Sequence, residues 1–519
     1  MSGGTVLNSR TSSPFAILAK PLLEDSQLRK NLRHATDVIG AKRDAVVAEL
    51  PDWQALREAG RALRQHTIEN LAFYLEQFEA NFTRAGGVLH WARDAEEARR
   101  ITIALVKDAV GRGDTASAIA GHLAGEPAGT HPGAEEGSGC PLRGEVIKIK
   151  SMTTEEIQLN KALEDAGVHP YETDLAELII QLGGDAPSHI VVPALHKNRQ
   201  QVREIFKREM QLDDLGDTPQ DLADAARKFL REKFLRVQTA VSGANFLIAE
   251  TGGVCVVESE GNGRMCLTLP ETLITIAGID KVIPRFADLE VLLQLLPRSA
   301  TGERMNPYNS VWTGVHEGDG PRQFHLVLLD NGRSDVLADE VGRQTLNCIR
   351  CGACQNVCPV YRQTGGHAYG SVYAGPIGAI LTPQLQKLES AQSLPFASTL
   401  CGACYEVCPV KINIPEVLVH LRNEISGEKK SAWTDPEAFA MAAMAKVFTS
   451  ERRFQAAQRL GRLAETALVH DDGTGVRWIS WLPGLLGGWT QVRDLREMPK
   501  ETFRDWWRKR KGNGGNHAS

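Results

Sequence analysis

The sequence predicts an α+β multidomain protein. We expect an α/β domain after a helical N-terminal segment, then a cysteine-rich α-helical domain and a small C-terminal region. Three observations support this prediction. The chain has 519 residues, several times the roughly 150 residues of one domain. Short apolar runs alternate with charged helical stretches in its middle part, and seven of its ten cysteines fall between residues 348 and 408.

Composition and charge exclude several classes of protein. Hydrophobic residues make up 42% and charged residues 24%, as in ordinary globular proteins. A net charge of −5 gives no overall attraction to nucleic acid, so no nucleic-acid partner is expected. No apolar run reaches the roughly 20 residues that cross a bilayer, and no secretory signal is visible. We expect a cytoplasmic protein, where clustered thiols favour metal binding or redox chemistry over disulfides.

Residues 1–85 are predicted to form the helical segment. Leu71, Leu75, Phe78 and Phe82 recur at spacings of four and three, which places them on one helix face. A stripe of this kind usually packs against a core, and that interpretation is favoured over a binding role.

Residues 86–345 are predicted to form the α/β domain. Alternation of strands with helices favours a largely parallel sheet covered by helices. Within the domain, residues 112–143 are rich in glycine and proline and are predicted to be a flexible insertion that contains a spare thiol, Cys140. The predicted strands include the apolar runs His189–Val192, Phe246–Ala249, Val254–Val257, Leu273–Ala277 and Phe324–Leu329.

Two cysteine runs within residues 346–428 form an internal repeat with an offset of 50. The runs read Cys348-x2-Cys351-x2-Cys354-x3-Cys358-Pro and Cys401-x2-Cys404-x3-Cys408-Pro. Runs of this type wrap iron–sulfur clusters, and in two-cluster ferredoxins of the bacterial type the last cysteine of a run binds the other cluster. The sequence therefore predicts two clusters, the first held by Cys348, Cys351, Cys354 and Cys408 and the second by Cys358, Cys401 and Cys404.

The second cluster lacks a fourth cysteine, because the offset places Ser398 where the first run has Cys348. Three outcomes are open: Ser398 supplies an oxygen ligand, a water, another side chain or a partner completes a 4Fe–4S cluster, or the site holds a 3Fe–4S cluster. Structural zinc is the alternative for both runs. Zinc sites usually combine two separated pairs of ligands, whereas these runs have four and three cysteines, so two iron–sulfur clusters, preferably 4Fe–4S, are predicted.

Residues 429–519 are predicted to be a helical, tryptophan-rich region. Five of the nine tryptophans lie in its tail from Val476 to Lys511, and WISWLPGLLGGW spans residues 478–489. This segment could bind a partner, touch a membrane surface peripherally or pack on the protein's own core, because aromatic side chains favour all three settings.

These motifs resemble those of the lactate utilization protein B family. The resemblance runs from about residue 20 to 511 and includes KIKSMTTEEIQLNKALEDAG (148–167), ETGGVCVVESEGNGR (250–264), the first cysteine run through 383 and STLCGACYEVCPVKINIP (398–415). It implies a lactate-utilization α/β domain and a helical ferredoxin domain with two 4Fe–4S clusters on the seven cysteines. It also implies a cytoplasmic partnership with a cysteine-rich subunit and a smaller subunit related to the α/β domain, in L-lactate oxidation.

A lactate or pyruvate site in the α/β domain needs positive charge for the carboxylate and a base near the 2-hydroxyl group. Arg264 is the carboxylate candidate, helped by Lys150, and Glu250 or Glu258 is the candidate base. The backbone of Thr251, Gly252 and Gly253 could also approach an anion. A tight turn between two strands explains the same glycines, and we favour the turn.

The chain is easier to explain as an electron relay than as a complete catalyst. It has no G-x-G-x-x-G motif after a strand and no P-loop, so no nicotinamide, flavin or nucleotide site is supported. Clusters pass one electron at a time, whereas oxidation of a 2-hydroxy acid removes two. We therefore expect an oxidoreductase component that relays electrons from L-lactate to an acceptor. The alternatives are a subunit for another 2-hydroxy acid, such as glycolate, or a protein with structural or sensory clusters.

Overall fold

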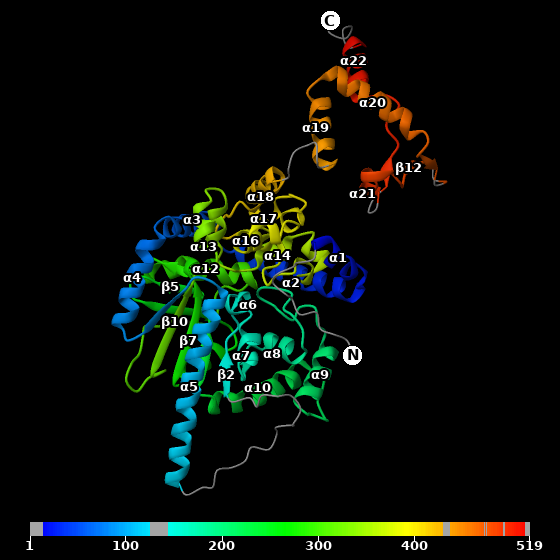
Figure 1. Ribbon diagram of the computed structural model, residues 1–519. Helices are drawn as coiled ribbons and strands as arrows, with labels where there is room; N and C mark the ends of the chain where they lie inside the picture. Colours follow the sequence, from blue (N-terminus) through cyan, green and yellow to red (C-terminus); the bar gives the residue numbers. More distant parts are fainter. Residues whose placement is uncertain are drawn as a thin grey trace. The chain divides into compact units, whose positions relative to one another are not determined.

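The computed structural model describes residues 14–124, 144–428, 436–471, 473, 475–490 and 494–513. The contacts within the chain separate a first unit, residues 1–426, from a second unit, residues 427–519. In Figure 1 the first unit runs from blue to yellow and the second from orange to red. Each unit is described by itself below.

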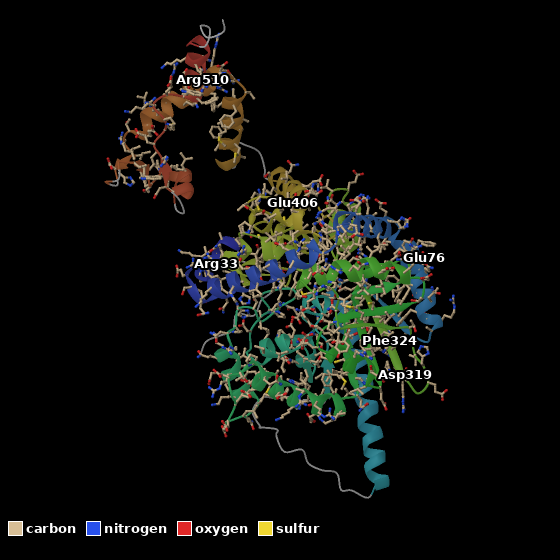
Figure 2. All side chains as sticks on the ribbon, turned by 180° about the vertical axis from the view of Figure 1, so that it is seen from behind. Arg33, Glu76, Asp319, Phe324, Glu406 and Arg510 are labelled. Atoms are coloured by element: carbon tan, nitrogen blue, oxygen red, sulfur yellow. The ribbon has the colours of Figure 1, made fainter. Side chains whose placement is uncertain are left out.

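Among the residues described from Pro14 onward, four α-helices precede the first strand: α1 (Phe15–Glu24), α2 (Ser26–Ala48), α3 (Trp53–Glu69) and α4 (Leu71–Arg84). The predicted apolar stripe lies on α4, where all four of its side chains are buried, so its assignment to the core is confirmed. The rings of Phe78 and Phe82 stack with centroids 5.6 Å apart, and Phe82 meets the edge of Phe324 at 5.1 Å. Phe324, labelled in Figure 2, belongs to the main sheet, so α4 packs against that sheet.

The main sheet has six strands, all parallel, in the order β1-β10-β7-β4-β2-β3. Their bounds are β1 Val88–Ala92, β2 Gly144–Lys148, β3 Val168–Glu172, β4 Thr239–Ser242, β7 Thr272–Gly278 and β10 Gln323–Leu329. Alternate residues of β10 point to opposite faces, so Leu326 and Leu328 join one core and Val327 and Leu329 another. Burial of both faces is typical of parallel sheets and explains the continuous apolar runs.

Helices cover both faces of this sheet, as the α/β prediction requires (Figure 1). Side chains of α5 and α7 pack in the core with Val327, and those of α4, α8, α9 and α10 pack in the core with Leu326. The bounds of the helices in this region are α5 Ala95–Ala124, α6 Met152–Glu156, α7 Leu159–Asp165, α8 Leu175–Leu182, α9 Arg199–Glu209, α10 Pro219–Arg236, α11 Asn262–Thr268, α12 Leu289–Ala300 and α13 Arg333–Ala338.

A second, four-stranded sheet has the order β8-β5-β6-β9. Its strands are β5 Phe246–Ile248, β6 Gly253–Glu258, β8 Val282–Ile283 and β9 Tyr308–Trp312. The pairs β5–β6 and β6–β9 are antiparallel, and only β5–β8 is parallel. Alternation of strands and helices does not reveal this sheet, because β5 and β6 follow each other with only a turn between them.

The predicted strand at His189–Val192 is wrong. This segment is irregular, because Nδ1 of His189 accepts the N–H groups of Val191 and Val192, each at 3.0 Å, and so folds the chain back on itself. The N–H of Ile190 is bonded to the Gln355 side chain at 3.2 Å instead of to a neighbouring strand. The apolar run therefore marks burial against the cysteine-rich domain.

The predicted insertion at 112–143 begins too early. Helix α5 continues through this glycine-containing stretch to Ala124, because alanine, isoleucine and leucine between the glycines favour a helix. The rest of the predicted insertion, with Cys140, lies outside the described residues.

The cysteine-rich region is helical, with α14 Ala353–Val357, α15 Tyr361–Thr364, α16 Gly375–Gln386, α17 Ala403–Val407 and α18 Ile414–Glu428. Helices α1 to α3 pack on it, since Ala19, Leu32 and Trp53 share a core with Cys351 and Cys408. Figure 1 shows the blue α1 and α2 beside the yellow helices. The N-terminal helical segment therefore has two partners, because α4 contacts the α/β sheets and α1 to α3 contact the cysteine-rich region.

The second unit contains four helices and a three-stranded antiparallel sheet among its described residues. These are α19 Pro436–Phe448, α20 Glu451–Glu465, α21 Gly487–Thr490, α22 Phe503–Asn513, β11 His470–Asp471, β12 Arg477–Ile479 and β13 Leu495–Arg496. Trp481 is 65% exposed, and Trp506 and Trp507 are also exposed. No helix in the described part of the chain is long and apolar enough to cross a membrane.

Gly252 offers a test of the packing between α4 and the β5–β6 hairpin. It has a φ of +70°, and a Cβ atom there would lie 2.4 Å from the backbone nitrogen of Phe82. We expect Gly252→Ala to lower stability by more than the roughly 1–2 kcal/mol of left-handed strain alone. Gly40→Ala, in an open position of α2, should instead raise the free energy of unfolding by about 1 kcal/mol. Thermal unfolding followed by circular dichroism measures both, and equal effects of the two substitutions would contradict this packing.

Candidate metal centre

The two cysteine runs have the same backbone conformation at the offset of 50 residues. Helices α14 and α17 begin at Ala353 and Ala403, each after a glycine with positive φ, +72° at Gly352 and +84° at Gly402. The preceding residues, Arg350 and Leu400, are also left-handed, with φ of +61° and +54°. In each run the two left-handed residues flank one cysteine and turn the chain sharply, so each Cys-x2-Cys segment can present two thiols to one side.

Four cysteines line one cavity. Its lining consists of Cys348, Cys351 and Cys354 from the first run and Cys408 from the second, together with apolar side chains such as Ile190, Ile377 and Ile412. Burial raises the pKa of the Cys351 thiol, and the nearby Cys408 and Cys348 raise it further. The last cysteine of the second run therefore lies with the first three of the first run.

The remaining three cysteines form a second group. Burial raises the pKa of the Cys404 thiol to about 12, and the adjacent Cys358 and Cys401 add to this effect. Cys358 and Cys404 are buried, whereas Cys401 is exposed. Cys404 also raises the pKa of Cys354, so the two groups are neighbours.

The donor sets fit iron–sulfur clusters. Buried thiols that raise one another's pKa cannot all ionise without a compensating cation, and all-sulfur donor sets suit soft metal centres. Backbone amides already point at two of the sulfurs: the N–H of Arg350 donates to Cys348 Sγ at 3.4 Å and that of Ile412 to Cys408 Sγ at 3.3 Å. Such N–H···S contacts tune the potential of a bound cluster.

Ser398 occupies the position that corresponds to Cys348. Its Oγ accepts the N–H of Leu400 at 3.1 Å, which repeats the contact of Cys348 Sγ with the N–H of Arg350. Ser398 is half-buried, and its carbonyl oxygen accepts a hydrogen bond from Arg422 at 3.1 Å. The duplicated backbone thus places an oxygen atom where the first run places a sulfur.

Buried arginines surround the first cysteine group: Arg350 belongs to the first run itself, whereas Arg57 and Arg64 lie outside any motif of the sequence. Arg57 on α3 donates to the carbonyl of Cys408 at 2.9 and 2.8 Å, and the fully buried Arg64 donates to the carbonyl of Leu346 at 3.0 Å. Arg350 forms an ion pair with Asp280 at 3.3 Å. Positive charge at these positions offsets the negative charge of thiolates. Arg57 and Arg64 lie on one helix, α3, far in the sequence from Arg350, so only the fold brings them to the first cysteine run.

A buried ionic network connects the α/β domain to this centre. Arg333 pairs with Asp280 at 2.7 Å and with Glu156 at 2.8 Å, and the Tyr373 hydroxyl donates to Glu156 at 2.6 Å. Burial alone would raise the pKa of Asp280, but Arg333 and Arg350 hold it below its usual value. The carboxylate therefore stays charged between the two guanidinium groups.

The turn proposed for Gly252 and Gly253 is present. Strands β5 and β6 pair antiparallel, and Gly252 is left-handed in the turn between them. The Thr251 side chain accepts the N–H of Gly253 at 3.1 Å, and the Glu250 carboxylate accepts that of Phe286 at 2.9 Å. These groups stabilise the local backbone, and their role in substrate binding stays a prediction.

Glu258 and Arg264 lie at the end of β6 and the start of α11. The Glu258 carboxylate accepts N–H groups of Gly261, Gly263 and Arg264 at 2.9, 2.9 and 2.8 Å. The Arg264 guanidinium lies 5.7 Å from the centroid of the Tyr308 ring. The loop backbone thus engages the Glu258 carboxylate and the Tyr308 ring of β9 engages the Arg264 guanidinium, and no shared ligand is needed to explain their positions.

Lys150 belongs to a group of buried charges at the carboxyl ends of β2 and β3, the edge at which open α/β sheets bind ligands. Its Nζ lies 3.6 Å from Glu177 Oε1. The Nζ of Lys148 lies 2.5 Å from Glu172 Oε1 and 3.3 Å from Glu155 Oε1. Burial, with Glu155 and Glu172 nearby, raises the pKa of Glu177 to about 8 although Lys150 opposes the shift. Lys150 was predicted from the sequence as a substrate-binding candidate, whereas its partners Glu177, Glu155 and Glu172 belong to no motif and are brought together only by the fold.

Comparison with known proteins divides the chain into three matching parts. Family models match for a LUD domain over residues 75–329, a 4Fe-4S dicluster domain over 344–412 and the C-terminal domain of lactate utilisation protein B over 419–512. The chain is 39% identical to lactate utilization protein B 1 of Bacillus mycoides, with 98% of each chain covered. It is 38% identical to lactate utilization protein B of Shouchella clausii over 97% of this chain and 98% of that protein.

Proposed function

The chain belongs to the lactate utilization protein B family, and from this premise we propose that it is the iron–sulfur electron-transfer subunit of a system that oxidises L-lactate to pyruvate. The proposal rests most on the convergence of seven thiols from a duplicated segment into two adjacent groups. Two neighbouring redox centres suit an electron relay. The thiols and the absence of a membrane-crossing helix among the described residues fit an expected cytoplasmic location.

Each group of thiols would hold one 4Fe–4S cluster, and such clusters accept and release single electrons when bound. Cys348, Cys351, Cys354 and Cys408 would hold the first. Cys358, Cys401 and Cys404 would hold the second, with Ser398 as its fourth ligand. Apolar side chains keep water from the first group, and Arg57, Arg64 and Arg350 favour its reduced, more negative state.

The whole reaction needs partners, because lactate oxidation removes two electrons and two protons. We propose that a cysteine-rich subunit and a smaller subunit related to the α/β domain complete the system, with an electron acceptor beyond them. The exposed Cys401 supports transfer at the second group, since an exposed ligand lets a redox partner approach closely.

Cys351→Ser tests the relay. The anaerobically purified wild-type chain should contain about eight iron atoms, as two 4Fe–4S clusters require, and L-lactate added to the assembled system should reduce them. Cys351→Ser should lose the first cluster and lactate-dependent electron transfer. Cys266→Ser, at a buried thiol that contacts Thr173 at 3.5 Å, is the matched control and should retain both. An iron-free wild-type chain, or unchanged turnover in Cys351→Ser, would refute the relay. Reduction of the clusters by glycolate but not by L-lactate would refute L-lactate as the substrate.

Ser398 offers a separate test of the second cluster. Ser398→Ala removes the oxygen ligand, so electron paramagnetic resonance should show conversion of the second cluster toward a three-iron form while the first signal persists. Ser398→Cys should restore four-iron character, because it recreates the ligand set of the first run. A Ser398→Ala spectrum identical to that of the wild type would show that Ser398 is not a ligand.

A further inference from the structure

The two halves of the cysteine repeat share a backbone conformation but differ in what covers them. In the first run, Arg350 and Gln355 are 8% and 0% exposed. At the offset of 50 residues, Leu400 and Tyr405 are 39% and 38% exposed, and the thiol between them in sequence, Cys401, is exposed as well. The face that is buried in the first half of the repeat is therefore open in the second half.

The loop between α8 and α9 covers the first run. The N–H of Ile190, in this loop, donates to Gln355 Oε1 at 3.2 Å. A Cβ atom on Gly352 would lie 3.2 Å from His189 Cε1, also in the loop. A Cβ atom on Gly402, the matching glycine of the second run, would meet no atom of the described residues within 4 Å beyond its own neighbours in the chain. The second run thus has open space where the first run has the loop.

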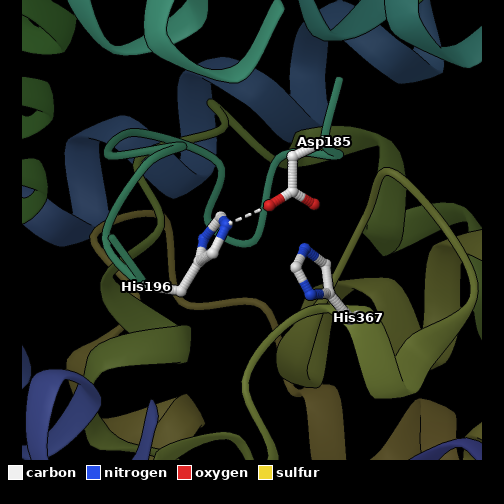
Figure 3. Close-up of side chains that lie close together, drawn as sticks. All are labelled: Asp185, His196 and His367. Carbon is white, nitrogen blue, oxygen red and sulfur yellow. Dashed lines mark hydrogen bonds and ion pairs between the residues drawn. The ribbon is translucent and has the colours of Figure 1, made fainter. Parts of the chain in front are cut away.

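Polar contacts hold this loop against the spacer between the cysteine runs. Within the loop, His196 Nε2 lies 3.0 Å from Asp185 Oδ2, and Figure 3 shows both side chains beside His367 of the spacer. The Nε2 of His367 lies 2.8 Å from the carbonyl oxygen of Ala186. Because the loop is bonded on both sides of the first run, the cover of that run is a fixed part of the fold.

The open face of the second run is mainly apolar. We define the Cys401 face by five residues: Phe396, Leu400, Cys401, Gly402 and Tyr405. The Phe396 side chain is 52% exposed, and the guanidinium of Arg422 lies 5.1 Å from the centroid of its ring. Glu406, which follows Tyr405, is exposed and is labelled in Figure 2. An apolar centre with charged groups at its edge is the usual composition of a protein–protein interface.

We propose that the Cys401 face binds a redox protein that exchanges electrons with the second cysteine group. This inference rests on the proposed function, and it commits to the cysteine-rich subunit of that system as the partner. The recognising chemistry is apolar contact around an exposed thiol ligand, so the partner presents apolar side chains near its own redox centre. In each transfer the chain loses one electron and the partner gains one, so no further reactant is needed.

A second α/β domain of the kind in this chain does not fit the Cys401 face. In the first run, Arg350 pairs with Asp280 at 3.3 Å, and Gln355 accepts a backbone N–H of the α8–α9 loop. Leucine and tyrosine replace these two side chains at positions 400 and 405. A domain that covered the second run in the same way would bring a polar group against Leu400, which cannot pair with it, and burial of an unpaired polar group is unfavourable.

Titration calorimetry of the purified cysteine-rich subunit into the anaerobic, cluster-loaded chain tests the proposal. Leu400→Glu and Tyr405→Glu should each weaken binding by roughly tenfold or more, because each places an unpaired charge in an apolar interface. Leu235→Glu, at a leucine of α10 that is 62% exposed, is the matched control and should bind as the wild type does. Iron content and visible absorbance should be the same in all three variants and the wild type.

Electron transfer gives a second readout. The chain is reduced with dithionite, and its oxidation by the cysteine-rich subunit is followed by stopped-flow absorbance. The second-order rate should fall in Leu400→Glu and Tyr405→Glu but not in Leu235→Glu. Lactate takes no part in this reaction. Failure of L-lactate to reduce the wild-type system would therefore refute the proposed function, whereas the variants decide the Cys401 face by themselves.

Three results would overturn the proposal. The first is a wild-type chain that does not bind the cysteine-rich subunit, as expected if another part of the chain or a second copy covers this face. The second is wild-type affinity in both Leu400→Glu and Tyr405→Glu. The third is an equal loss of affinity in Leu235→Glu. If Leu400→Glu loses iron, Tyr405→Glu decides the question.

Discussion

The main constraint on the fold of the first unit is that seven thiols from two separate runs lie together in two adjacent groups. Thiolates so close together repel one another, and this repulsion must be offset by bound metal and by nearby positive charge. The chain meets the second requirement with Arg57 and Arg64 from α3 and Arg350 from the first run itself. The N-terminal helices thus lie against the cysteine-rich region because they supply both its apolar cover and part of its charge.

The α/β domain is joined to this centre by polar contacts as well as by packing. The side chains in the series of ion pairs from Glu156 through Arg333 and Asp280 to Arg350 are at most 7% exposed, and removal of one partner would leave an uncompensated charge. The α8–α9 loop adds the contacts of His189 with Asn356 and of Ile190 with Gln355. The carboxyl edge of the parallel sheet and the cysteine groups are therefore connected by direct polar contacts.

The sequence predicted those features that are encoded locally. Cysteine spacing, the apolar stripe of α4 and the runs of β7 and β10 each depend on residues a few positions apart, and the parallel sheet followed from their alternation with helices. The buried charges could not be predicted, because Arg64, Asp280 and Arg350 meet only in the folded chain. The His189–Val192 run failed as a strand because its burial comes from another region and its backbone bonds to side chains.

The assignment of Cys408, in the second run, to the cluster of the first run is tested most directly by spectroscopy of variants that each lack one cysteine. Electron paramagnetic resonance of reduced Cys408→Ser, compared with Cys351→Ser and Cys404→Ser, shows which cluster each cysteine serves. Crossed ligation predicts that Cys408→Ser loses the same signal as Cys351→Ser, although Cys408 lies in the other run. Loss of the signal that Cys404→Ser also loses would mean that each run holds its own cluster, and would contradict the account.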